Sequence, residues 1–168
     1  MCGQQRLIHR LPRVRYDELE AAIRHLVAGA GDDNLRRFGA ETVARLVRDE
    51  RLLDVATEDE LDEDALAALT LARENLLTAS PTELRAQLTR IDDGILTDGD
   101  MDPELLTAVS ALEHWTTYLE TGQRDELYQL ALRSIEQVDF QVSADLGDFL
   151  AEPEMAAEYD RIARLLTT

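Results

Sequence analysis

The sequence contains no lysine, a single cysteine and only 5% aromatic residues. Because Cys2 has no second cysteine to pair with, an internal disulfide is excluded. No stretch alternates β-branched or aromatic residues with polar ones, as a half-buried strand requires. No segment reaches the roughly 20 consecutive apolar residues that cross a bilayer, and Met1 is not followed by the apolar run of a secretory signal. We therefore expect a cytoplasmic protein that does not enter a membrane.

Every one of the 17 basic residues is arginine, and 35 acidic residues bring the formal net charge to −18. The charge is uneven: residues 1–51 hold 10 arginines and 8 acids, whereas residues 52–168 hold 7 arginines and 27 acids. Such a surface repels nucleic acid and anionic membranes and attracts basic proteins. We expect a basic protein partner and no direct contact with nucleic acid or membrane. The alternative, that the acidity serves solubility alone in a saline or GC-rich source, stays open.

The apolar residues, 45% of the chain, are mainly leucine, alanine and valine and recur at helical spacing. A chain of 168 residues suits one domain, so the sequence predicts an all-α fold with a single compact bundle of six to eight helices. Residues 16–168 form the predicted helical domain. Residues 1–15 hold four arginines and Pro12, and form a predicted basic arm. The arm either binds an acidic surface, its own or a partner's, or has no fixed structure.

Several helix boundaries have strong local signals. Ser80-Pro81-Thr82-Glu83 combines a serine cap, proline at the first helical position and a glutamate that reaches back. Asp102-Pro103 and Pro153 predict two further starts, and Gly94 and Gly122 predict two ends.

Two other helical segments are interpreted from weaker signals. Thr57 and Glu60 form a capping-box pattern before a leucine-rich stretch that reaches Leu77. Its apolar residues cover most of the helix circumference, which predicts a central helix. Gly39 predicts a break between two short helices.

The sequence predicts no catalytic, cofactor-binding or metal-binding residue. Asp98, Asp100 and Asp102 have the spacing that opens a calcium loop, but Pro103 replaces its glycine and Val109 its bidentate glutamate. None of the three histidines has a ligand partner three or four residues away, and His114 is predicted to lie on the surface. We expect no metal or cofactor.

The partner-binding prediction depends on a dense acidic run, formed by Glu58, Asp59, Glu60, Asp62, Glu63 and Asp64. A run of this kind is either a solvated patch at a helix start or a surface that recognises a cationic partner.

The last part of the chain contains a helix rich in small residues, from Ala108 to Gly122, and a second from Glu126 to Phe140. A closing helix follows, which begins at Pro153 and contains the pair Glu158-Tyr159. In these features residues 65–166 resemble the YjaG-like family of all-helical bacterial proteins of unknown function. The resemblance implies a compact helical bundle and no catalytic residues.

These observations favour a non-catalytic acidic protein that binds another macromolecule, for example an immunity-type or regulatory inhibitor of a basic protein. Mimicry of nucleic-acid charge is a special case of this hypothesis. The alternatives are an enzyme that uses carboxylates in a surface cleft, and a bundle whose charge has no partner.

Overall fold

The computed structural model describes residues 13–54, 59–97 and 99–168. Within them the chain is all-α: helices alternate with short links, and the extended pairing is limited to two isolated bridges. The prediction of an all-α bundle of six to eight helices is confirmed. In chain order the helices are α1 Tyr16–Gly29, α2 Asp32–Val47, α3 Arg51–Asp54, α4 Glu63–Glu74, α5 Pro81–Asp93, α6 Pro103–Thr121, α7 Arg124–Val142 and α8 Pro153–Thr167.

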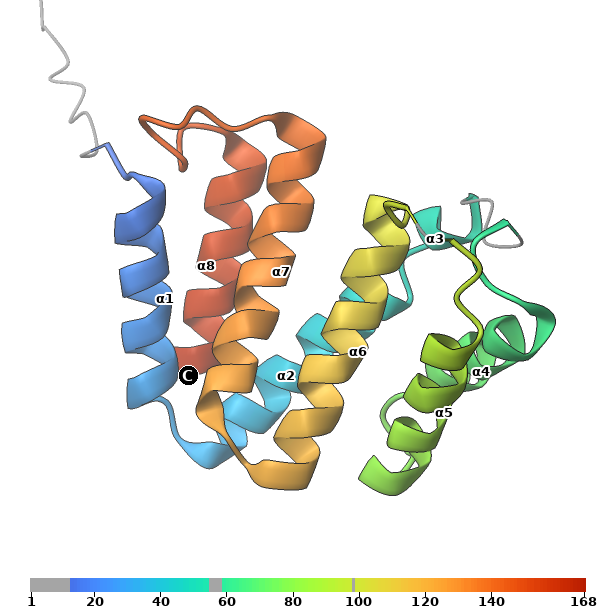
Figure 1. Cartoon of the computed structure of the whole chain (residues 1–168). Helices are drawn as coiled ribbons and strands as arrows, with labels where there is room; N and C mark the ends of the chain where they lie inside the picture. The colour runs from blue at the N-terminus through green and yellow to red at the C-terminus, as the bar shows by residue number, and fades with distance from the viewer. Residues whose placement is uncertain (1–12, 55–58, 98) are drawn as a thin grey trace, which may run out of the picture.

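The centre of the molecule is built from α2, α6 and α7, which all pack on one another. On one side α1 and α8 cover α7, and α8 also contacts α2. On the other side α5 packs on α6, and α4 packs on α5 (Figure 1). The hairpin of α4 and α5 is therefore attached to the bundle mainly through one face of α5.

The strong local signals give the predicted boundaries. Ser80 and Glu83 form the complete capping box of α5, and Asp102 caps α6 by accepting from the backbone N–H of Glu104 over 2.9 Å. Gly122 ends α6 in the left-handed conformation, with φ of 70°, which favours glycine. α8 begins at Pro153 as expected.

The predicted start and central position of the leucine-rich helix are wrong. α4 begins at Glu63 with Asp62 as its cap, and Leu61 instead pairs with Ile95; Thr57 lies outside the described residues. α4 is also peripheral, because Leu71 is 40% exposed. A helix with leucine and alanine around most of its circumference is therefore not fully buried here, because α4 packs mainly on α5.

The predicted break at Gly39 is also wrong, because α2 is continuous and Gly39 is buried in its middle. A Cβ at this position would lie 2.5 Å from Cζ3 of Trp115 and 2.8 Å from Cδ2 of Leu127. Gly39 therefore allows the backbone of α2 to approach α6 and α7 closely. Close packing between helices, and not a turn, requires glycine at this position.

The basic arm lies mostly outside the described residues, which begin at Arg13. Val14 is held by the loop before α8: its N–H donates to Asp148 over 3.2 Å, and its carbonyl accepts from the N–H of Phe149 over 2.7 Å. Tyr16 then packs its ring on that of Phe149, with centroids 5.2 Å apart. These contacts fix the start of α1 against the end of the bundle.

Candidate functional site

Three acids of the predicted run have structural partners. Asp62 caps α4 by accepting from the N–H of Ala65 over 2.8 Å. Asp64 forms an ion pair of 2.7 Å with Arg90 of α5. Glu60 accepts from the backbone N–H of Asp102 over 2.7 Å. These acids therefore organise the hairpin, in addition to carrying charge.

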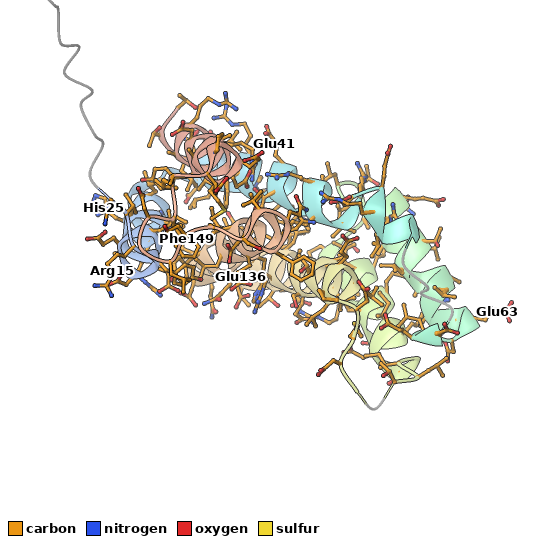
Figure 2. The ribbon with its side chains drawn as sticks, turned by 90° about the horizontal axis from the view of Figure 1, so that it is seen from above. Arg15, His25, Glu41, Glu63, Glu136 and Phe149 are labelled. Atoms are coloured by element: carbon orange, nitrogen blue, oxygen red, sulfur yellow. The ribbon has the colours of Figure 1, made fainter. Side chains whose placement is uncertain are left out.

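Two other acids of the run, Asp59 and Glu63, are exposed and make no hydrogen bond or ion pair within the described part of the chain. Glu63 lies at the far end of the molecule and its side chain points away from it (Figure 2). Glu58 lies outside the described residues. Of the predicted site, Asp59 and Glu63 are thus the acids that the structure leaves available to a partner.

The fold brings further acids to this place from distant parts of the sequence. The N–H of Asp62 donates to the carbonyl of Gly94 over 2.8 Å, and the N–H of Leu96 donates to the carbonyl of Glu60 over 2.8 Å. The start of α4 is therefore joined to the end of α5 and the loop that follows. We call the resulting surface the acidic end; it consists of Asp59, Glu60, Asp62, Glu63, Asp64, Asp92, Asp93, Asp100 and Asp102.

The pKa of Asp92 is raised by burial and, in part, by the negative charges around it. Burial raises the pKa of this carboxyl, and the charges of Glu113 and Asp93 raise it further, while Arg85 partly opposes them. Within the described residues Arg90 and Arg85 are cations near the acidic end, but Arg90 pairs with Asp64 and Arg85 pairs with Glu113 and Glu120 of α6. A cationic ligand would meet carboxylates that the protein has not neutralised.

Apolar side chains interrupt the acidic end. Ile95 is 37% exposed and Leu96 is 57% exposed, both in the loop that follows α5. The surface therefore combines charge with apolar area that a protein partner is able to bury.

Arg85 attaches the hairpin to the bundle. Its guanidinium makes a two-pronged contact with Glu120, of 2.7 Å and 3.1 Å, and a 2.6 Å contact with Glu113 on the same face of α6. These hydrogen bonds to carboxylates raise the pKa of Arg85 still further above its already high value. A charged group thus sets how α5 lies on α6.

A second group of charges lies between α2, α7 and α8, around one buried carboxylate. Glu158 is 4% exposed and accepts hydrogen bonds from Ser134, Arg45 and Arg161, the last at 2.8 Å. Arg161 also donates to Thr42 over 3.0 Å. Burial alone raises the pKa of Glu158, but the hydrogen bonds and charge of Arg161, with Ser134 and Arg45, outweigh it and hold that pKa below its ordinary range.

This buried cluster satisfies its own charges, and Glu158 has almost no surface left for a ligand. We interpret it as the contact that holds α8 in place. This cluster was not predicted from the sequence, although Glu158 is spaced three and four residues from the apolar Met155 and Ile162 of the predicted core face.

The prediction of a surface position for His114 is wrong in part. Its side chain is 21% exposed, and Nδ1 lies 2.8 Å from Oε2 of Glu126 on α7. The contact joins α6 to α7 across the turn at Gly122, so the residue has a structural partner.

Among the described residues, no three carboxylate, imidazole or thiol groups lie close enough to share a metal ion. Asp98, the first member of the aspartate triplet, is outside those residues, and Asp102 serves as the cap of α6. No described helix is long and apolar enough to span a membrane.

Comparison with protein-family models, curated proteins and solved structures gives no match for this chain. The resemblance to the YjaG-like family therefore stays a prediction.

Proposed function

We propose that this protein is a non-catalytic binding protein, and that it recognises a basic protein partner through the acidic end of the α4–α5 hairpin. The observation that carries the proposal is the gathering of acids from residues 59–64, 92–93 and 100–102 on one projecting end of the molecule. An immunity-type or regulatory inhibitor of a basic enzyme is a function of this kind. Mimicry of nucleic-acid charge is the version in which the partner is a nucleic-acid-binding protein.

The geometry favours an effect of the acidic end on the rate at which the partner associates. Charges on an exposed surface attract a partner over roughly one Debye length, about 8 Å at physiological salt. A projecting end exposes its acids on several sides, so a large part of the field reaches solvent. Exposed charges of this type act mainly on the rate of association.

The acids that already have partners are unsuitable for a test, because their removal would also damage the fold. The hairpin variant therefore carries Asp59→Asn, Glu63→Gln and Asp93→Asn. The matched body variant carries Asp33→Asn, Glu41→Gln and Asp160→Asn. All six are exposed and unpaired within the described part of the chain, and each variant removes three charges, including one acid from a first helical turn.

The experiment is capture of proteins from a cell extract at low salt on immobilised wild type, hairpin variant and body variant, with polyglutamate as a nonspecific polyanion. The proposal predicts a basic protein that is retained by wild type and body variant, is reduced on the hairpin variant, and does not bind polyglutamate. If every captured protein also binds polyglutamate, or if the two variants behave alike, the acidity serves solubility and the proposal is wrong.

A further inference from the structure

A groove lies between α6 and α7, in the upper part of both helices in Figure 1. It has a volume of about 190 Å³. Its walls include Glu104, Leu106 and Ser110 from α6 and Glu136, Gln137 and Phe140 from α7. Neither the acidic end nor the buried cluster uses this groove.

Two large apolar side chains stand exposed along it. Leu106 is 52% exposed and Phe140 is 67% exposed, although both belong to helices that form the centre of the bundle. Leu105, the neighbour of Leu106, is fully buried and belongs to the face of α6 that packs in the core. Leu106 lies outside that face and leaves apolar surface exposed to solvent. Exposed apolar residues that face each other across a groove are typical of a protein interaction site.

The groove is also continuous with the acidic end. Pro103 and Glu104, at its upper limit, directly follow Asp102, which belongs to the acidic end and accepts the N–H of Glu104. Glu136 supplies a further carboxylate on the opposite wall, where it pairs with Arg133 over 2.7 Å. Two exposed apolar side chains of the groove therefore lie near the carboxylate of Glu104 on one wall and the Arg133–Glu136 pair on the other.

This pattern is the complement of a basic amphipathic helix. Such a helix carries apolar side chains at three- and four-residue spacing on one face and cations on its flanks, and helices of this kind bind in apolar grooves between helices. Its apolar face would cover Leu106 and Phe140, while its cations would meet Glu104 and the neighbouring acids.

Resting on the proposed function above, we propose that the basic partner binds through an amphipathic helix whose apolar face occupies the Leu106/Phe140 groove. The acidic end then accelerates the encounter, and the groove determines how long the complex lasts. A partner recognised by charge alone would leave the groove unused.

The probe is a labelled helical peptide of leucine and lysine, roughly 18 residues or about five turns long, with its leucines on one face. A second peptide of the same composition has its leucines distributed evenly around the helix. The groove variant carries Leu106→Gln and Phe140→Gln, which keep helix propensity close to that of the parent. Its matched control carries Leu71→Gln and Leu146→Gln, two exposed leucines outside the groove.

Binding is measured by fluorescence anisotropy at a salt concentration of a few tenths molar, where charge attraction is short-ranged. We expect wild type and matched control to prefer the one-faced peptide by about tenfold, since part of two large apolar side chains is buried. The groove variant should lose that preference.

Equal preference in wild type and groove variant would overturn the inference. The proposed function would survive that result if the hairpin variant still weakened low-salt binding, and both would fail if neither variant had an effect. Self-association of wild type in sedimentation, removed in the groove variant, would assign the groove to a second copy of the chain and would also overturn the inference.

Discussion

The carboxylate of Glu60 accepts a hydrogen bond of 2.7 Å from the backbone N–H of Asp102, 42 residues further along the chain. The contact fixes the segment before α4 against the start of α6, and both residues belong to the acidic end. The same surface therefore contains acids that hold the fold and acids that are available for binding. Mutations in the first group should change stability, and mutations in the second group should change binding.

Removal of the Asp62 cap should destabilise the protein, whereas removal of its exposed neighbour should not. Asp62→Ala loses the bond to the N–H of Ala65, and loss of such a cap costs about 0.5–2 kcal/mol. Glu63→Gln changes a side chain without partners within the described residues and should shift the free energy of unfolding by less than about 0.5 kcal/mol. Urea denaturation measures both, and Asp62→Asn, which keeps a capping oxygen, is the control. Equal effects of Asp62→Ala and Asp62→Asn would contradict the assignment of the cap.

Gly39→Ala should destabilise the protein, although alanine normally favours a helix by about 1 kcal/mol over glycine. The new Cβ would overlap Trp115 and Leu127, both buried, and overpacking of this kind costs about 1–3 kcal/mol. The control is Gly29→Ala, at the end of α1, where a Cβ meets no atom within 4 Å. Thermal melts followed by Trp115 fluorescence should show opposite shifts, and a higher melting temperature for Gly39→Ala would contradict the close contact of α2 with α6 and α7.

Glu158→Gln should destabilise the protein at neutral pH and much less in acid. The substitution leaves Arg161 and Arg45 near a neutral group. Because water still reaches both arginine side chains, which are 18% and 39% exposed, we expect a loss of about 1–3 kcal/mol. Because the pKa of Glu158 is held low in the folded state, its contribution is present above the ordinary glutamate pKa, about 4.3, and is lost as the pH falls through the lower folded value.

Unfolding free energies of wild type and Glu158→Gln are therefore compared between pH 7 and pH 3, with the exposed Glu154→Gln of the same helix as control. The gap between wild type and Glu158→Gln should close in acid. A gap that is the same at all pH values would show that the lost stability comes from packing and not from the charge of Glu158.

The local parts of this fold are predictable from the sequence, and its long-range contacts are not. Ser80 and Asp102 cap helices through residues two or three positions away, so their role is visible in a short window. The role of Gly39 is not visible in a short window, because Trp115 and Leu127, which leave no room for a Cβ there, lie far along the chain. A glycine inside a helix has two interpretations, a break or a close approach, and the sequence alone does not choose between them.

The candidate site was predicted in part for the same reason. The acids from Glu58 to Asp64 lie within one short stretch of the sequence, so the sequence predicts this part of the site directly. Asp92, Asp93 and Asp100 join it because α4 and α5 form an antiparallel pair, which the short link between them favours. The partners of Glu60 and Asp64 depend on that pairing, so the sequence could not show which acids the fold already uses.

Recognition of a basic partner by the acidic end is tested most directly by association rates. The captured partner is mixed with wild type, hairpin variant and body variant over a salt series. We expect the hairpin variant to associate several-fold more slowly than wild type at low salt and the body variant to stay close to wild type. The three association rates should converge as salt screens the charges. Dissociation rates should differ much less. Association rates that are equal for the two variants, or that do not change with salt, would contradict the claim that the acidic end recognises the partner.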